Sequence, residues 1–569
     1  MKRNTLTTAV LAGLTGMAGM VSVSNAVNVN PDGLGQVLLY PYYTARGDNA
    51  TLISIVNTTT RGKAVKIRFI EALNSREVLD FNIYMSPFDV WTAGIVATDE
   101  GGGKMLTADT TCTVPYIFGS FDGEQEFLTT ELVDGGPDGA ERTASGYIEV
   151  IEMGTMLETP QNNPGVGSPY YIPWAAKHQD GVPPATGLDF DTGLQDREPC
   201  GHLVDQWTNN FPGGNLPWLG AAGPTWGFDT EMGASGGLFG GGSIVNALDG
   251  TMFSYNAVAL DGFWAPGTTR HTTPDSLEPD LSSGNEFVSN VFVNGQVASH
   301  NWFSLTFESS DVAAVNAVLT YNQLLNEYNT EALAGARTEW VMTMPTKRFH
   351  TDAAEEGFLD PADDALPPFQ DTWTNASPGA CESFAFTTPT SFEEYYETDN
   401  SRAFDREERP DISTVTIEPP IVSPPPDDNG PEPTFFQLCR EANVIRFSSG
   451  DPDGENIPGE SEILKELWRD GSGLGFSNFE LPFDAGWVRF DLTQIPDEVG
   501  GGVRISQPGL NLNTQMYEQI EGLPVIGFAA NTFVFDEVEA GVRANYGGTF
   551  THRGSRNIVP SDYDGELRD

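Results

Sequence analysis

The chain has 569 residues, of which 39% are hydrophobic and 11% aromatic, a composition that supports packed cores and excludes a wholly disordered protein. Its 80 acidic residues against 29 basic ones give a formal net charge of −51, and such a surface repels nucleic acid and anionic membranes. The excess of acid also suggests adaptation to a salty medium, where ions screen the self-repulsion. The 62 glycines and 39 prolines favour many short strands joined by turns.

Residues 1–26 have the features of a secretory signal peptide. Lys2 and Arg3 precede the mostly apolar run Thr8–Val23, and Ser24–Ala26 has the small-x-small pattern of a cleavage site. The alternative is a membrane anchor, but the apolar run is shorter than the roughly 20 residues that a span needs. We therefore expect an exported protein at the cell surface, in the medium or in the periplasm, with no transmembrane span in the mature chain.

Four strands are predicted between Thr51 and Val96, at Thr51–Val56, Lys63–Ile70, Val78–Met85 and Val90–Val96. In the second, Val65, Ile67 and Phe69 alternate with Lys66 and Arg68, which places apolar and polar side chains on opposite faces. Turn residues separate the runs. The pattern predicts a four-stranded antiparallel unit with one face buried.

The rest of the chain predicts a mainly β protein, made of one or two antiparallel β-sandwiches with long insertions rich in Gly, Pro and Trp. We expect a sandwich domain at 27–350 with an insertion at 154–242, and a second β-rich region at 351–569 with a proline-rich loop at 418–433. The one notable helix is predicted at Ser309–Tyr328, where apolar residues recur at helical spacing. In the predicted strand Trp487–Leu492, Trp487 and Arg489 lie opposite Val488 and Phe490.

The four cysteines are widely spaced, and an even number in an exported chain favours disulfide bonds. Of the three possible pairings we prefer Cys112–Cys200 with Cys381–Cys439. Each bond would close a long excursion and contribute roughly 4 kcal/mol by the chain-entropy argument. The alternative is buried free thiols.

The insertion at 154–242 carries four tryptophans that could form an aromatic platform for sugars or a partner: Trp174, Trp207, Trp218 and Trp226. The alternative is that these rings pin an irregular loop to the sandwich, and the sequence favours that alternative. A loop of this length within a compact domain is either functional or a small embedded subdomain.

The segment Asp451–Glu462 places oxygen ligands at positions 1, 3, 5 and 12 of a calcium-type loop: Asp451, Asp453, Glu455 and Glu462. Position 6 is Asn456 instead of Gly, and position 8 is Pro458. A short helix is expected to follow at Ile463–Trp468. Ca²⁺ is the only cofactor that the sequence suggests, and a solvated acidic turn is the alternative reading of this segment.

Motifs for catalysis are weak. Gly233–Gly237 fits the G-x-S-x-G pattern, but a nucleophile elbow needs a strand before the serine and a helix after it, and here glycines surround Ser235. The six histidines have none of the usual metal-binding spacings. We therefore assign no catalytic residues and favour a role other than that of an enzyme.

Several segments resemble a family of exported, uncharacterised bacterial cell-surface proteins; they are Asp32–Thr44, Asn74–Thr92, Thr338–Phe349, Phe404–Glu408 and Leu438–Phe447. The resemblance covers most of the mature chain in separate islands. It implies a shared, mainly β fold, and it brings no catalytic residues.

These observations predict an acidic structural or adhesive protein of the cell surface or medium, self-assembling and stabilised by Ca²⁺. Its partners would be further copies of itself, surface glycans or other envelope proteins. One alternative is an extracellular carbohydrate-binding protein or hydrolase that uses the tryptophan-rich insertion. Another is a periplasmic scaffold for an envelope complex.

Overall fold

The structure is a computed structural model that describes residues 26–156, 175–183, 200–205, 207, 233–268, 270–302, 310–354, 364–385, 402–406, 417–418, 435–449, 458–468, 475–481, 483–539 and 542–563. The predicted signal peptide, apart from Ala26, lies outside these residues, as do residues 419–433 of the predicted proline-rich loop. The described part is mainly β, as predicted, and its strands form several sheets that are antiparallel except for the pair β23–β24.

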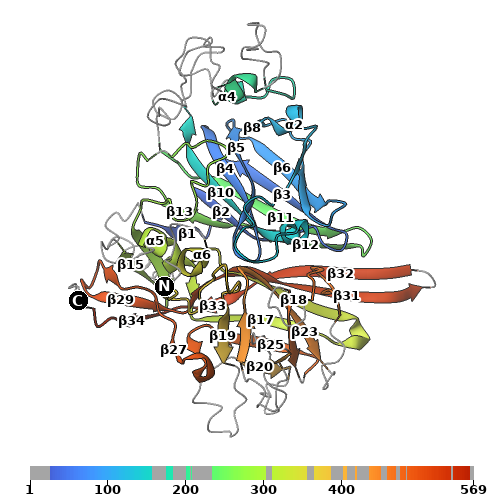
Figure 1. Ribbon diagram of the computed structural model, residues 1–569, viewed down its shortest axis with the longest axis vertical. Coiled ribbons are helices and arrows are strands. Elements are labelled where there is room, and N and C mark those ends of the chain that lie inside the picture. The colour runs from blue at the N-terminus through green and yellow to red at the C-terminus, as the bar shows by residue number, and fades with distance from the viewer. Residues whose placement is uncertain are drawn as a thin grey trace, which may run out of the picture.

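The upper half in Figure 1 is a sandwich of two sheets. The seven-stranded sheet has the order β1-β13-β2-β10-β4-β5-β8, formed by Asn28–Val29, Val258–Asp261, Val37–Thr44, Ser145–Met156, Gly62–Glu71, Glu77–Met85 and Cys112–Val114. The six-stranded sheet has the order β12-β11-β3-β6-β7-β9, formed by Thr251–Asn256, Leu238–Asn246, Asn49–Asn57, Val90–Ala97, Gly103–Leu106 and Glu124–Glu126.

All four strands predicted between Thr51 and Val96 are present, but they do not form one sheet. β3 pairs with β6 in the six-stranded sheet, and β4 pairs with β5 in the seven-stranded sheet. The turns after β3 and β5 therefore cross the sandwich instead of closing hairpins. The reason is burial: apolar rows such as Ile53 and Ile55 on β3 and Ile67 and Phe69 on β4 share one core only when they face each other.

The lower half holds a second pair of facing sheets. One has the order β21-β24-β23-β18-β31-β32, formed by Ile417–Glu418, Ser477–Leu481, Ala442–Ser449, Ala336–Thr343, Ile526–Glu539 and Val542–Thr551. The other has the order β20-β25-β17-β33, formed by Arg402–Asp405, Ala485–Asp491, Gln323–Asn329 and Arg553–Ser555. Trp340, Phe447 and Phe490 lie in the core between them. As the sequence predicted, Val488 and Phe490 face this core and Trp487 faces away.

A five-stranded sheet lies beside the lower pair, in the order β14-β15-β28-β29-β34, formed by Val288–Val293, Gln296–Asn301, Gly509–Asn511, Tyr517–Glu521 and Asn557–Pro560. Three two-stranded sheets complete the described strands; they are β16–β30 (Thr320–Tyr321, Leu523–Pro524), β19–β22 (Glu382–Ala385, Phe435–Leu438) and β26–β27 (Gln494–Ile495, Gly502–Val503).

The predicted helix at Ser309–Tyr328 is half right. Helix α5 spans Ser310–Leu319, and the chain then continues as strands β16 and β17. The apolar residues of the second half do not extend the helical stripe, because Leu324 and Tyr328 enter the lower core as β17 pairs with β25. Tertiary pairing here overrides a local helical pattern. The other described helices are short: α2 (Ile117–Ser120), α4 (Gly201–Asp205) and α6 (Arg348–Thr351).

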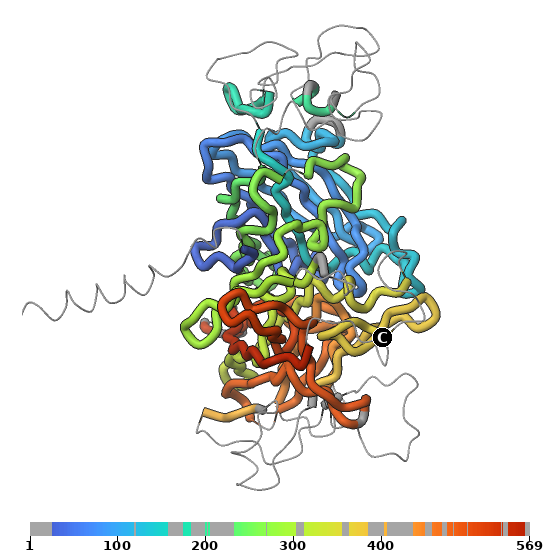
Figure 2. The backbone as a smooth tube through the Cα atoms, turned by 90° about the vertical axis from the view of Figure 1, so that its left-hand side faces the viewer, coloured from blue at the N-terminus to red at the C-terminus, as the bar shows by residue number. Residues whose placement is uncertain are grey.

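The two halves, which Figure 2 shows following one another along the long axis, share one hydrophobic cluster, and the division between them does not fall at residue 350. β18 precedes residue 350, yet its sheet neighbours β23 and β31 follow it. Val341, Val444 and Phe528 of the lower half belong to the same hydrophobic cluster as the upper core. Residue 350, where the sequence suggests a boundary, lies within the buried helix α6.

Both predicted disulfide bonds are present. Cys112–Cys200 joins β8 to the start of α4, with a Cα–Cα distance of 5.5 Å. Cys381–Cys439 joins the chain next to β19 and β22, two strands that also pair with each other. Both cysteine pairs close long excursions of the chain, as the spacing suggested. None of the helices in the described ranges is long and apolar enough to cross a membrane.

Candidate functional site

Of the four tryptophans in the predicted platform, the structure describes Trp207. Trp174, Trp218 and Trp226 lie outside the described residues. The indole Nε1 of Trp207 donates a hydrogen bond to the Tyr84 hydroxyl at 2.9 Å. The ring packs edge-on against His271, with centroids 5.0 Å apart, next to the Cys112–Cys200 bond. Trp207 therefore holds its segment against β5. This contact agrees with the alternative reading of the sequence, in which the tryptophan rings pin the insertion to the sandwich.

The predicted calcium loop is described only at its last ligand; Asp451, Asp453 and Glu455 lie outside the described residues. Both carboxylate oxygens of Glu462 accept hydrogen bonds from the Arg446 guanidinium at 2.7 Å. Within the described ranges, no group of three or more His, Cys, Asp or Glu residues could hold a metal ion. A calcium ion that used Glu462 would have to compete with this bidentate pair, and the calcium site stays a prediction.

The short helix predicted at Ile463–Trp468 is wrong. Residues 458–468, which we call the joining segment, are irregular. The backbone N–H groups of Ile463 and Leu464 both donate to the buried Glu339 carboxylate at 2.8 Å, and the Ser461 hydroxyl donates to it at 2.9 Å. The backbone N–H groups that would lie in the first turn of the predicted helix are thus bound by a side chain of β18, which is distant in sequence.

The joining segment also binds the upper half through Glu466. Its carboxylate accepts hydrogen bonds from the Tyr42 hydroxyl at 3.0 Å and the Ser145 hydroxyl at 2.8 Å. It forms ion pairs with Arg46 at 3.0 Å and with Arg440 at 3.3 Å. Because Tyr42 lies on β2 of the upper sandwich and Arg440 precedes β23 of the lower, this one carboxylate ties the two halves together.

The two buried carboxylates at the joining segment have opposite pKa shifts. Burial, with the nearby Glu462 charge, raises the pKa of Glu339 to about 7. Burial alone would also raise the pKa of Glu466, but Arg440 and Arg46 outweigh it and hold that pKa at about 2. Glu466 is therefore an anion at neutral pH, and its stabilising contribution depends on that charge.

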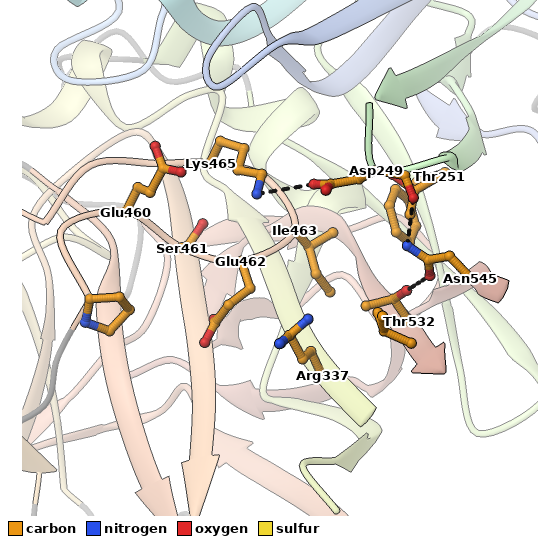
Figure 3. A pocket seen from close by; sticks show the side chains of 13 residues that line it. Asp249, Thr251, Arg337, Glu460, Ser461, Glu462, Ile463, Lys465, Thr532 and Asn545 are labelled. Atoms are coloured by element: carbon orange, nitrogen blue, oxygen red, sulfur yellow. Dashed lines mark hydrogen bonds and ion pairs between the residues drawn. The ribbon is translucent and has the colours of Figure 1, made fainter. Parts of the chain in front are cut away.

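A cavity of about 320 Å³ opens beside the joining segment, between the two halves (Figure 3). Lys465 on one wall forms an ion pair with Asp249, which precedes β12, at 3.1 Å. On the opposite wall Asn545 of β32 donates to the Asp249 backbone carbonyl at 2.9 Å. Arg337 of β18 is exposed there, and its guanidinium has no bonding partner among the described residues. The walls come from both halves, so the cavity is a product of their packing.

The largest feature that the sequence did not reveal is a buried ionic layer on the outer face of the seven-stranded sheet. Lys66 pairs with Asp80, and Arg68 pairs with Glu77 at 2.5 Å and Glu149 at 2.6 Å. The alternating pattern predicts the correct face of β4 for Lys66 and Arg68, yet both side chains are 0% exposed. The face is covered by chain that includes residues 272–280: Lys66 donates to the Pro274 carbonyl at 2.9 Å, and Asp280 pairs with Arg348 of α6 at 2.8 Å.

A second buried cluster lies at the end of the same sheet. Arg142 forms a two-bonded pair with Asp134, with both distances 2.7 Å, and also contacts Glu71 at 2.9 Å. Arg76 joins Asp134 to Asp352 through ion pairs of 3.3 and 2.8 Å. Despite its burial, the pKa of Asp134 falls to about 2, because Arg142 and Asn74 bind the carboxylate. The cluster therefore holds the chain around residues 71–76, 134–142 and 352 together.

The Gly233–Gly237 segment is structural. The Glu152 carboxylate accepts the backbone N–H groups of Ser235 at 2.9 Å and Gly236 at 2.8 Å, donors that an oxyanion hole would need. Buried Lys63 binds both Glu152 and the Ser235 hydroxyl, at 2.7 and 2.8 Å. The chain then enters strand β11, where a nucleophile elbow has a helix. The motif therefore anchors a loop to β4 and β10.

Comparisons of the chain with protein-family models, with the curated proteins and with the solved structures find no match. The resemblance to exported cell-surface proteins therefore stays a prediction from the sequence.

Proposed function

We propose that this chain is an exported structural or adhesive protein of the cell surface, and that its copies associate through the hairpin β31–β32. The predicted signal peptide supports export. The two disulfide bonds support it too, because such bonds persist in oxidising compartments outside the cytoplasm. The buried ionic layer and the shared core make a rigid framework that suits a structural role better than a mobile one.

The hairpin is the observation that carries this proposal. β31 pairs with β18 only as far as Phe533, whereas its pairing with β32 continues to Glu539. The end of the hairpin is therefore a two-stranded ribbon, and Figure 1 shows it reaching beyond the body of the molecule. Three of its large side chains are exposed: Phe535 is 41% exposed, Val538 57% and Tyr546 63%.

A two-stranded ribbon is marginal in water by itself, and its free edges pair readily with another strand. The same ribbon in a second copy offers both matching edges and matching apolar side chains. A formal net charge of −51 opposes association, but salt shortens the range of that repulsion to about 10 Å or less. Association should therefore require salt or a divalent cation, and Ca²⁺ at Asp451–Glu462 would lower the charge in the same way.

Light scattering and electron microscopy of residues 27–569 test the proposal. We expect monomers at low salt and larger assemblies at high salt or with added Ca²⁺. The double variant Phe535→Ser/Tyr546→Ser should stay monomeric in both conditions. The control Phe292→Ser removes a ring whose exposure, 56%, lies between those of Phe535 and Tyr546, from a different hairpin, and this variant should assemble normally. Monomers in every condition, or unchanged assembly of the hairpin variant, would contradict the proposal.

A further inference from the structure

A groove of about 470 Å³ lies on the outer face of the four-stranded sheet, with β32 along one side. Its floor comes from β17, β25 and β33, and the opposite faces of β17 and β25 enter the lower core. The β32 side is fixed to the floor by Asn326, which donates to the Phe550 carbonyl at 3.1 Å. The lining residues that matter for binding are Glu327, Trp487, Phe550 and Arg553.

The aromatic part of the groove is held in place before any ligand arrives. Register places Phe404, Trp487 and Glu327 side by side across three strands. The Trp487 ring stacks on the Phe404 ring, with centroids 4.3 Å apart and planes at 10°. Phe550 stands on the β32 side and is 51% exposed. The Trp487 ring, fixed in this way, loses little conformational entropy when a flat ligand face packs on it.

The charged part of the groove differs from the ionic layer in being unpaired. Glu327 and Arg553 are both exposed, and neither side-chain charge has an ion pair or hydrogen bond within the described ranges. Register places Leu325 opposite Arg553 on the neighbouring strand, so no acid faces it there. The groove thus offers a carboxylate and a guanidinium with free hydrogen-bonding capacity, and their charges cancel.

We propose that this groove binds a neutral glycan chain. A pyranose ring has an apolar C–H face that packs on Trp487 and Phe550, and it carries neighbouring hydroxyls at its edge. The Glu327 carboxylate would accept from such hydroxyls, and the Arg553 guanidinium would donate to them. The balanced charge favours a neutral ligand over an acidic one. The inference does not depend on association through β31–β32, whose apolar ends lie further along the hairpin.

Affinity electrophoresis tests this inference directly, because the strongly acidic chain migrates well in native gels. Residues 27–569, at the low salt where we expect monomers, would be run with soluble β-glucan, xylan, mannan and galactomannan, and with acidic alginate. We expect at least one neutral polysaccharide to retard the protein. Trp487→Ala should weaken that retardation by about tenfold or more, and Glu327→Gln and Arg553→Ala should each weaken it.

Phe292→Ala removes an exposed ring elsewhere and should leave the retardation unchanged. Circular dichroism and thermal unfolding check each variant, and Glu327→Gln serves if Trp487→Ala fails to fold. The inference is overturned if no neutral polysaccharide retards the chain, if only alginate does, or if folded groove variants bind like the wild type. Retardation of a chain that stays monomeric at high salt would support the groove and refute hairpin association.

Discussion

The same alternating pattern has two different outcomes in the two halves of the molecule. On β4 of the upper half, Lys66 and Arg68 point away from the apolar core and are nevertheless 0% exposed. In the four-stranded sheet of the lower half, Glu327 and Arg553 also point away from the core, and both are exposed to solvent. Alternation therefore predicts which side a residue takes, and it does not predict whether that side meets water.

The facing strands distinguish the two cases. Arg68 lies opposite Asp80 on one neighbouring strand and opposite Glu149 on the other. Arg553 lies opposite Leu325. A buried charge needs partners to offset its desolvation, whereas an exposed one does not. Complementary charges on facing strands are thus a cue for a covered face, and they become visible only when the register of the strands is known.

The largest effect is expected when the ionic layer is broken. Arg68→Met removes the cation between Glu77 and Glu149 and leaves buried carboxylates without their partner. Loss of one member of a buried pair costs about 3–5 kcal/mol. We expect the free energy of unfolding, measured by urea titration of residues 27–569, to fall by that amount.

The double variant Arg68→Met/Glu149→Gln separates charge from packing. If the loss comes from an unpaired anion, neutralising Glu149 should restore part of the stability. A double variant as unstable as Arg68→Met alone, or more so, would assign the loss to packing. If the free energy of unfolding of Arg68→Met lay within about 1 kcal/mol of the wild-type value, the ionic layer would not hold the covering chain in place.

The joining segment offers an intermediate effect that depends on pH. The folded-state pKa of Glu466, about 2, lies below its usual value of 4.5. The ion pairs with Arg46 and Arg440 therefore stabilise the fold above pH 4.5, and this contribution is lost as the pH falls toward 2. The shift corresponds to about 3 kcal/mol. Glu466→Gln should lower stability at pH 7 and flatten the acid limb of a stability profile.

Glu124→Gln is the matched control, because it neutralises a carboxylate that is 56% exposed and pairs with a surface lysine. It should leave both the stability at pH 7 and the acid limb unchanged. Equal acid limbs in the wild type and Glu466→Gln would show that acid unfolding starts elsewhere, for example at Asp134, whose pKa is also about 2.

Local sequence patterns predicted the elements better than their partners. The four strands after Thr51, the outward side of Trp487 and both disulfide bonds follow from spacing and composition, and the structure confirms them. The pairing of β3 with β6 was missed, because two turns that look like hairpins cross the sandwich instead. Helices were overestimated at Leu324–Tyr328 and at Ile463–Trp468, where contacts from distant strands override the local pattern.

The candidate site was harder to predict than the fold, for the same physical reason. Trp487, Glu327 and Arg553 are separated by up to 226 positions, and only register brings them together. The sequence pointed instead to the tryptophan-rich insertion, because its four tryptophans are close together in the sequence. At Trp207, the one of those rings that is described, the indole is engaged with Tyr84 and His271. Residues that are close in sequence identify a single segment, whereas the residues that line a groove on a sheet come from several strands.

The smallest effect is expected on the exposed face of the four-stranded sheet. Arg553→Met makes the same substitution as Arg68→Met, but at a guanidinium that solvent already surrounds. Surface substitutions of this kind change stability by about 0.5 kcal/mol or less, so its urea midpoint should match that of the wild type. If Arg553→Met were as destabilising as Arg68→Met, solvent exposure would not explain the difference in stability between the two faces. The face of the lower sheet that carries Arg553 would then be covered by another part of the chain.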